Sequence, residues 1–505
     1  MFNKTVIATA LGAALAIPHA ANAATAADKA ALAQIRVQIQ QLKVSYEARI
    51  QSLEQRLQAS EARGAPLNAT SQPGAATVPG AGPAPTDSAV TAVNMAPAPA
   101  PAFTPAPADA YVAPAAAAVA TPVTATGNGF NPTIALILGG SYVNLSQDPN
   151  RYRLQGFMPA ADGIGPGPRG LNLGESELTL AANIDPTFAG QLTFSLAADH
   201  SLSVEEAFFR TQGLANGLNL KAGRFLSSIG YLNMQHAHTW DFIDAPLAYQ
   251  AFLGGQYKPE GIQLRWLAPT ERFTEVGIEL GRGNNYPGND RNRNGVGSSA
   301  VFAHVGDDIG DSASYRAGLS YLRTSAAQRS FDDTNAAGVP VVNAFSGNSG
   351  TLIADGIYKW APNGNPVQTN VKLQGEYFRR TEHGDLAADL ASTSGPGANS
   401  SYRNAQSGWY LQGIYQFTAG WRAGLRYDRL DAGNARFGST LAAADFSQLA
   451  RFHPQRATAM VDYSPSEFSR FRLQYAQDRS RPGASDNQIF LQYIMSLGAH
   501  GAHTF

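Results

Sequence analysis

The sequence predicts an all-β transmembrane barrel of about sixteen antiparallel strands over residues 130–505, preceded by an N-terminal α-helical coiled coil and a disordered Pro/Ala-rich linker. Three observations predict this class. Apolar and polar residues alternate with period two from about residue 133 onward, short turns alternate with long polar loops, and the chain opens with an export signal. A soluble β-sandwich shows the same alternation but does not need loops of different length at its two ends.

Residues 1–23 have the parts of a secretory signal peptide. Lys4 precedes the apolar run 6–17, and an A-x-A cleavage sequence follows at 21–23. The apolar run is too short to span a bilayer as a helix, and no other segment reaches the roughly 18 apolar residues that a spanning helix needs. We therefore expect an exported protein whose mature chain begins at Ala24.

The composition excludes several classes of protein. The chain has no cysteine, so it has neither a disulfide framework nor a thiolate metal site. A formal net charge of −1 argues against a nucleic-acid partner. Charged residues make up 15% of the chain, which suits a soluble protein or a barrel with a wet interior equally well. No motif in the chain calls for a cofactor.

Residues 28–63 are predicted to form a coiled coil. This stretch lacks Gly and Pro, and its Leu, Ile and Tyr residues recur every three or four positions in one narrow stripe, with a stutter between Tyr46 and Leu53. Such a helix needs a partner, which is either its own copy or a membrane or barrel surface. Isoleucines among the leucines favour a trimer. Residues 64–126 are rich in Pro, Ala and Gly and are predicted to be an extended linker.

The stretch 171–197 shows the strand pattern most clearly. Apolar residues occupy one parity and polar residues the other until Asp185-Pro186 breaks the run, and the alternation restarts at Phe188. Because successive strand side chains point to opposite faces, this stretch is a hairpin with one apolar and one polar face.

Similar runs recur along the rest of the chain, each near the roughly 9–11 residues with which a tilted strand crosses a bilayer. Their connections are alternately short turns, such as IDPT and PNGN, and longer polar loops at 145–170, 226–259, 282–298, 324–350, 380–406 and 431–454. This is the layout of an outer-membrane barrel, and an even number of strands leaves both of its ends in the periplasm. Phe505 has the lipid-facing parity of the last strand.

With each apolar face assigned to lipid, charged residues of both signs point into the barrel. The predicted lumen-facing charges are Glu175, Glu177, Lys221, Arg265, Arg316, Lys372, Arg422 and Arg426, together with the basic residues Lys359, Arg456 and Arg472 and the acidic residues Glu275, Glu279, Asp355, Glu376, Asp428 and Asp462. Because the signs nearly balance, we expect a wet interior with paired charges or a transverse field, and no selectivity ring of one sign.

The third external connection, 226–259, is unusually apolar and aromatic for a loop in water. A segment of this kind has to bury its side chains, and the interior of the barrel is the available place. We expect it to fold inward and to narrow the pore. Its polar tips would be Gln235, His236, His238, Asp241 and Asp244.

His236 and His238, with Asp241 and Asp244 nearby, are candidate ligands for a divalent metal such as zinc. The H-x-H spacing alone is a weak signal, and histidines that only form hydrogen bonds within a folded loop explain it more simply. No G-x-S-x-G motif or phosphate-binding loop lies between a strand and a helix, so we expect no enzyme and assign no catalytic residue.

Three segments, LGESELTLAANID, VEEAFFRT and LNLKAGRFLSSIGYLN, resemble the porin O and P family of Gram-negative outer membranes. The resemblance extends over roughly 130–505 and is closest over 171–260. It implies a sixteen-stranded barrel, usually trimeric, that passes small solutes. Phosphate-selective members carry lysines and an arginine ladder at the constriction, whereas this third connection has Lys258 at its far end and otherwise His and Asp. The coiled coil followed by a Pro-rich linker resembles some sugar-specific porins.

We therefore expect a homotrimeric porin, surrounded by outer-membrane lipid, through which small solutes or ions diffuse passively, with its coiled coil in the periplasm. Two alternatives remain open. One is an envelope anchor whose coiled coil contacts peptidoglycan or a periplasmic partner. The other is a zinc-linked uptake component of the outer membrane.

Overall fold

The structure is a computed structural model, and it describes residues 132–160, 164–197, 201–395 and 397–498. The predicted signal peptide (1–23), coiled coil (28–63) and linker (64–126), and the terminal Phe505, lie outside the described residues.

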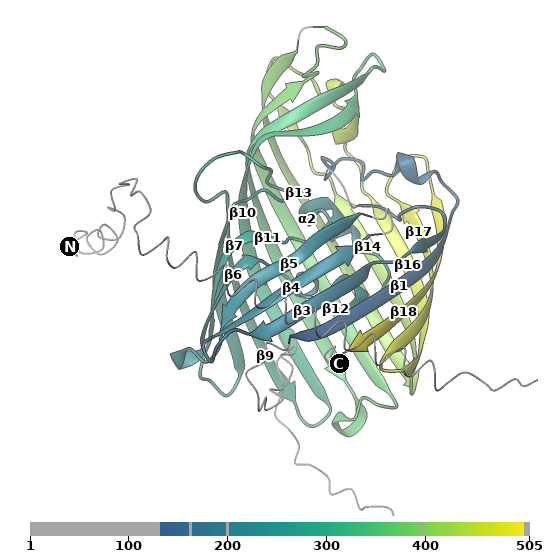
Figure 1. The fold of residues 1–505 in the computed structure, drawn as a ribbon. Helices are drawn as coiled ribbons and strands as arrows, with labels where there is room; N and C mark the ends of the chain where they lie inside the picture. The colour runs from purple at the N-terminus through teal and green to yellow at the C-terminus, as the bar shows by residue number, and fades with distance from the viewer. Residues whose placement is uncertain (1–131, 161–163, 198–200, 396, 499–505) are drawn as a thin grey trace, which may run out of the picture. The chain divides into compact units, whose positions relative to one another are not determined.

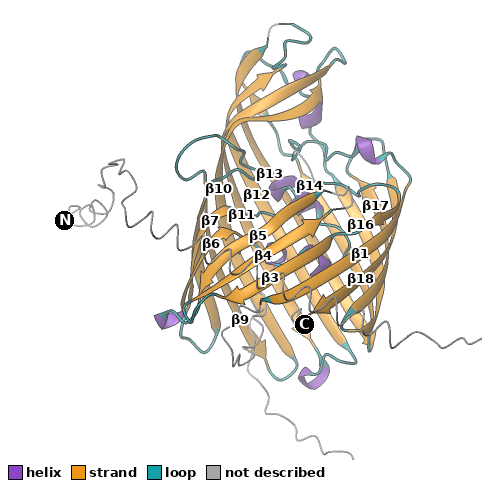
Figure 2. Ribbon diagram, in the orientation of Figure 1, coloured by secondary structure: helices purple, strands orange, loops and turns teal. Residues whose placement is uncertain are grey.

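The described residues contain 18 strands, one α-helix and seven short 3-10 helices (Figures 1 and 2). The strands are β1 (Thr133–Leu145), β2 (Gly170–Leu173), β3 (Ser176–Asn183), β4 (Phe188–Leu196), β5 (Leu202–Thr211), β6 (Leu218–Arg224), β7 (Glu260–Leu267), β8 (Phe273–Gly281), β9 (Ser298–Ile309), β10 (Ala313–Thr334), β11 (Pro340–Trp360), β12 (Asn370–Ala388), β13 (Ala398–Thr418), β14 (Trp421–Asp431), β15 (Arg436–Phe437), β16 (Gln455–Ser466), β17 (Ser469–Arg479) and β18 (Asp486–Gly498). The helix α2 spans Leu247–Leu253, and the 3-10 helices are Pro149–Arg151, Ala215–Gly217, Leu232–Met234, Ala237–Thr239, Pro362–Gly364, Ala443–Asp445 and Ser447–Leu449. None of the helices in this part of the chain is long and apolar enough to cross a membrane.

The strands form one antiparallel sheet that closes on itself (Figure 1). Closure occurs at β1, which pairs with β18 on one side and with β2 and β3 on the other. β2 and β15 are short segments beside longer neighbours, so sixteen strands make up the wall within the described residues, as the alternation predicts. A closed sheet pairs the backbone groups of every strand and leaves no edge.

Side chains on the outer face of the wall are mostly apolar, and those on the inner face are mostly polar, except where apolar residues such as Phe378 pack against the residues between β6 and β7. On β13, Trp409 and Leu411 are exposed on the outside, whereas the alternate residues Tyr410 and Gln412 are buried on the inside. This division is the one that a barrel needs when hydrocarbon surrounds it and polar groups fill it.

Leu411→Arg is expected to destabilise the barrel, because Leu411 is 58% exposed on the outer face and would carry a charge into hydrocarbon. Near the bilayer midplane the loss in free energy of unfolding should be about 2–4 kcal/mol. Denaturant titration of the protein in lipid vesicles measures it. Val296→Arg, between β8 and β9, is the control and should cost less than about 0.5 kcal/mol. Equal effects of the two substitutions would contradict the placement of β13 against lipid.

Two of the predicted long loops are mostly strand. β10 and β11 continue through most of 324–350 and leave a turn at 335–339, and β12 and β13 continue through most of 380–406. The extended hairpins rise above the rest of the barrel rim (Figure 1). Beyond the bilayer neither face has to be apolar, so the hydropathy alternation stops while the backbone ladder continues. The loop prediction was wrong for this reason.

The loop that follows β1 and the loop that precedes β16 pack on each other at the same end of the barrel. The backbone amide of Gly156 donates to the Gln448 carbonyl at 2.8 Å, and the Gln448 side chain donates to the carbonyls of Leu154 and Phe157 at 2.8 and 2.9 Å. Long connections at this end therefore form a packed layer, in contrast to the short turns at the opposite end.

Candidate functional site

Residues 226–259, called the inserted segment below, connect β6 to β7 and lie inside the barrel, where Figure 1 shows α2 enclosed by strands. The segment forms hydrogen bonds with inward-facing side chains of β3, β5, β12, β14, β16 and β17. Because these strands lie on different sides of the closed sheet, the segment crosses the lumen.

The helix α2 forms the apolar centre of the inserted segment. Pro246 precedes the helix, and Gly254, in the left-handed conformation with φ of 67°, ends it. Phe252 stacks on Phe378 of β12 with ring centroids 5.7 Å apart, and Tyr249 meets the same ring edge-on at 5.2 Å. These contacts bury the aromatic side chains that led us to expect inward folding.

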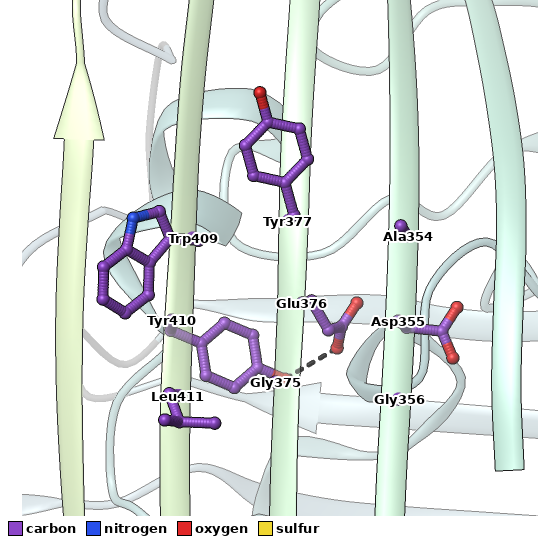
Figure 3. A pocket seen from close by; sticks show the side chains of 9 residues that line it. All are labelled: Ala354, Asp355, Gly356, Gly375, Glu376, Tyr377, Trp409, Tyr410 and Leu411. Atoms are coloured by element: carbon purple, nitrogen blue, oxygen red, sulfur yellow. Dashed lines mark hydrogen bonds between the residues drawn. The ribbon is translucent and has the colours of Figure 1, made fainter.

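Glu376 on β12 anchors the inserted segment to the wall. Its carboxylate accepts hydrogen bonds from the backbone amides of Tyr231 and Leu232 at 3.2 and 2.9 Å. It also accepts from the hydroxyls of Tyr249 at 2.9 Å and of Tyr410 at 2.7 Å, the second of which is drawn in Figure 3. Four donors compensate the burial of this carboxylate, which is 3% exposed.

The outer side of the same strands carries a hollow of about 460 Å³ (Figure 3). Its outward-facing lining consists of small and large apolar residues, namely Ala354, Gly356, Gly375, Tyr377, Trp409 and Leu411. The glycines leave room between the larger side chains of neighbouring strands. Because this lining faces away from the lumen, the hollow belongs to the membrane-facing surface and is not part of the barrel interior. The interior is the space that the inserted segment crosses.

Asp241 of the inserted segment lies in a group of basic residues. Its carboxylate contacts Nζ of Lys372 and lies 3.2 Å from Arg422, which also pairs with Asp462 at 2.6 Å. Burial alone would raise the pKa of Asp241, but Lys372 and Arg422 outweigh this effect and lower the pKa to about 2. Asp241 is therefore ionised at neutral pH and held against this part of the wall.

Asp244 forms a second group of ion pairs. Arg426 lies 3.0 Å from one carboxylate oxygen, Arg456 contacts the other, and Gln474 donates a hydrogen bond at 2.8 Å. Both arginines also approach Asp428, at 3.1 and 3.6 Å. Burial opposes ionisation of Asp244, but the two arginines lower its pKa overall. Asp241 and Asp244 thus fix one side of the inserted segment to β12, β14 and β16.

Four of the other predicted charges lie away from Asp241 and Asp244. Glu175 accepts a hydrogen bond from Ser195 at 3.2 Å, Lys221 lies 4.7 Å from the Phe208 ring, Arg265 pairs with Glu275 at 3.2 Å, and Arg316 pairs with Asp355 at 3.4 Å. Gln235 contributes its main-chain carbonyl, which accepts hydrogen bonds from Trp240 at 3.1 Å and Gln256 at 2.7 Å. The structure brings Lys372, Arg422 and Arg426 to the aspartates of the inserted segment and leaves these four charges elsewhere.

The two histidines contact glutamates of the wall, and not Asp241 and Asp244, which we expected beside them. Nδ1 of His238 lies 2.8 Å from Glu177 on β3. Nδ1 of His236 lies 3.1 Å from both Glu177 and Glu205, and its Nε2 lies 3.1 Å from Glu206 on β5. Burial disfavours the charged imidazole of His236, but these carboxylates raise its pKa well above the usual range. The expectation about the co-ligands was wrong, because the histidines and the aspartates contact different strands.

Comparison with known proteins gives distant similarities. No family model matches the chain, so the porin O and P resemblance stays a prediction. An uncharacterized protein of Aquifex aeolicus is 28% identical over 406 residues, which cover 74% of this chain and 80% of that protein.

Among solved structures, the loop L8 deletion mutant of OmpT, an outer membrane protein of Vibrio cholerae, superposes with a TM-score of 0.46 at 11% identity. That match covers 73% of this chain and 99% of the other. The outer membrane channel DcaP of Acinetobacter baumannii gives a TM-score of 0.41 at 12% identity, over 73% of this chain and 98% of DcaP. OprB of Pseudomonas putida gives a TM-score of 0.39 at 14% identity, over 73% of this chain and 94% of OprB. These similarities are too low to transfer a solute or an assembly state.

Sequence reasoning missed Glu205 and Glu206, because adjacent strand residues are expected to face opposite sides. In the pairing of β4 with β5, Thr193 lies opposite Glu206 but Phe194 lies opposite Val204, so Glu205 is the extra residue of a β-bulge. Both glutamates are buried and reach His236. The signal was the Glu-Glu pair itself, since without a bulge one of the two would face lipid.

Proposed function

We propose that this protein is an outer-membrane channel through which small solutes or ions diffuse passively, past a constriction formed by the inserted segment. The observation that supports this function is the course of that segment, which crosses the lumen and contacts inward-facing residues on different sides of the barrel. Hydrocarbon surrounds the wall, so the interior is the water-accessible path across the bilayer. The proposal gives no residue a catalytic role.

The charged wall residues that pair with ionisable side chains of the inserted segment are acidic on one side of it and basic on the other. On one side the inserted segment meets glutamates of β3 and β5, and on the other its aspartates meet basic residues of β12, β14 and β16. Fixed charges of opposite sign across a narrow passage create a transverse field. Selection among solutes would then follow their size and charge distribution, without an energy source.

The segments that resemble the porin O and P family support a diffusion channel of that general kind. We do not extend the proposal to phosphate selectivity. The basic residues at this constriction, Lys372, Arg422 and Arg426, are already paired with Asp241 and Asp244. An anion would have to compete with these carboxylates.

We further propose a homotrimer in the outer membrane of a Gram-negative cell, with the coiled coil of residues 28–63 in the periplasm. The mixed Ile and Leu seam of that segment supports three chains. The even number of wall strands supports a barrel with both ends on the periplasmic side.

Single-channel recording of the purified full-length protein in planar bilayers tests these proposals. We expect stepwise openings in groups of three, with conductance that follows the salt concentration. Single openings would contradict the trimer but not the channel. A folded barrel without conductance would contradict the channel and would favour an envelope anchor whose coiled coil binds peptidoglycan or a periplasmic partner.

A further inference from the structure

The contact of His236 and His238 with Glu177 joins the inserted segment to β3. The Nδ1 atoms of the two rings lie 3.1 and 2.8 Å from the two carboxylate oxygens of Glu177, and the ring centroids are 5.6 Å apart. One nitrogen from each histidine and one oxygen from Glu177 all lie within 4.8 Å of one another. Three potential metal ligands therefore meet at one point on the lumen side of the wall.

His236 has more carboxylate neighbours than protons to share with them. Its Nδ1 lies 3.1 Å from both Glu177 and Glu205. A ring nitrogen carries at most one proton, so these two carboxylates compete for a single N–H. A dication has no such limit, because it accepts several carboxylate and imidazole ligands at once. We propose that Glu177, His236 and His238 bind a divalent transition-metal ion of the zinc class.

The donor set fits this class of ion. Two imidazole nitrogens and one carboxylate oxygen are ligands that zinc takes in proteins, with a fourth position left for water or another carboxylate. Metal–ligand distances near 2.0–2.1 Å place tetrahedral ligand atoms about 3.3 Å apart, and the three ligand atoms, which lie within 4.8 Å of one another, would move closer by at most about 1.5 Å.

Glu206 supports the assignment from the other side of the ring. It lies 3.1 Å from Nε2 of His236, the nitrogen that would not bind the metal. A carboxylate at this place is the common partner of a metal-binding histidine, because it accepts the N–H of the distal nitrogen and sets the tautomer and orientation of the ring. Glu205, beside Nδ1, is placed to complete the coordination.

The carboxylates around the site also favour a cation, and the two histidines determine which class of metal ion it binds. Glu175, Glu177 and Glu205 form a second group whose ligand atoms lie within 4.8 Å of one another, and Lys258 pairs with Glu205 at 3.0 Å. That group offers oxygen alone and would suit calcium. The imidazoles of the first group favour a transition metal instead.

A bound metal would fix the inserted segment to β3, on the side away from its aspartates. This consequence rests on the proposed channel function. If the segment forms the constriction, saturation with Zn²⁺ should reduce fluctuations of the open channel and lower its conductance.

Equilibrium dialysis of the untagged full-length protein against Zn²⁺, and separately against Ca²⁺, tests the site. We expect one Zn²⁺ per chain and weaker binding of Ca²⁺. His236→Gln, His238→Gln and Glu177→Gln should each weaken Zn²⁺ binding by at least about tenfold. His304→Gln is the matched control, because His304 forms the same type of buried pair with Glu275, at 3.1 Å, on β9 and β8.

A second control replaces His500 and His503 by glutamine, since these are the other two closely spaced histidines of the sequence. Both control variants should bind Zn²⁺ like the parent. The proposal is overturned if the parent binds no Zn²⁺, if it prefers Ca²⁺, or if Zn²⁺ binding survives all three substitutions of the site.

If the variants fail to fold, the metal site can still be tested in the parent protein. Co²⁺ bound to the parent should give the absorption spectrum of a four-coordinate site with nitrogen and oxygen ligands, and a six-coordinate all-oxygen spectrum would contradict the assignment. Dialysis does not depend on conductance. Stoichiometric Zn²⁺ binding without conductance would therefore contradict the channel but support the metal site. Conductance without Zn²⁺ binding would support the channel but contradict the metal site.

Discussion

Glu376→Ala is expected to release the inserted segment from β12 and to increase single-channel conductance. The substitution removes the acceptor of four hydrogen-bond donors, which are the backbone amides of Tyr231 and Leu232 and the hydroxyls of Tyr249 and Tyr410. An unsatisfied buried donor costs about 1–3 kcal/mol, and partial rehydration of the four should leave a net loss of about 3 kcal/mol in the free energy of unfolding. The conductance rises because the freed segment no longer spans the lumen.

Thiol labelling measures this release directly, because the parent chain has no cysteine. Ala248 in α2 is fully buried, so Ala248→Cys should react slowly with a water-soluble thiol reagent in the parent and faster in the Glu376→Ala background. Glu275→Ala is the control. Its carboxylate pairs with Arg265 and His304, both outside the inserted segment, so it should lower stability without accelerating labelling. Equal labelling rates in all backgrounds would show that Glu376 does not anchor the segment.

Replacing Asp241 and Asp244 together by asparagine is expected to shift the ion selectivity strongly toward anions. The double substitution removes two negative charges from the constriction and leaves Lys372, Arg422 and Arg426 without these counter-charges. Loss of one partner from a buried pair costs about 3–5 kcal/mol, so the variant should also be less stable. The reversal potential in a KCl gradient measures the selectivity.

Asp290→Asn provides the control for this experiment. Asp290 is exposed between β8 and β9 and pairs with Arg282 at 2.8 Å, outside the inserted segment. It should leave both the reversal potential and the stability unchanged. A double variant whose selectivity stays at the parent value, or moves toward cations, would contradict the placement of the two aspartates on the solute path.

The wall of the barrel was predictable because a bilayer imposes a local rule on every strand. Hydrocarbon outside and polar groups inside require alternation, and alternation is visible in a few consecutive residues such as Trp421 to Arg426. The burial of the inserted segment was predictable for a similar reason, since its aromatic side chains are too apolar for water. Both inferences depend on composition and spacing within one segment.

The partners of the inserted segment were not predictable, because they depend on which distant strands meet it after closure. His236 and Asp241 are five positions apart, yet one contacts β3 and β5 and the other contacts β12 and β14. Nothing local to either residue encodes that difference. The bulge at Glu205 also escaped the period-two pattern, because one extra residue in a strand changes its facing without changing its composition.

The sequence of each strand therefore determined which of its side chains face lipid and which face the lumen, because burying apolar groups in lipid lowers the free energy. The closed sheet decided which charges meet across the lumen. An ion pair such as Asp244 with Arg426 spans 182 positions in the chain and exists only once the wall has curved around the segment.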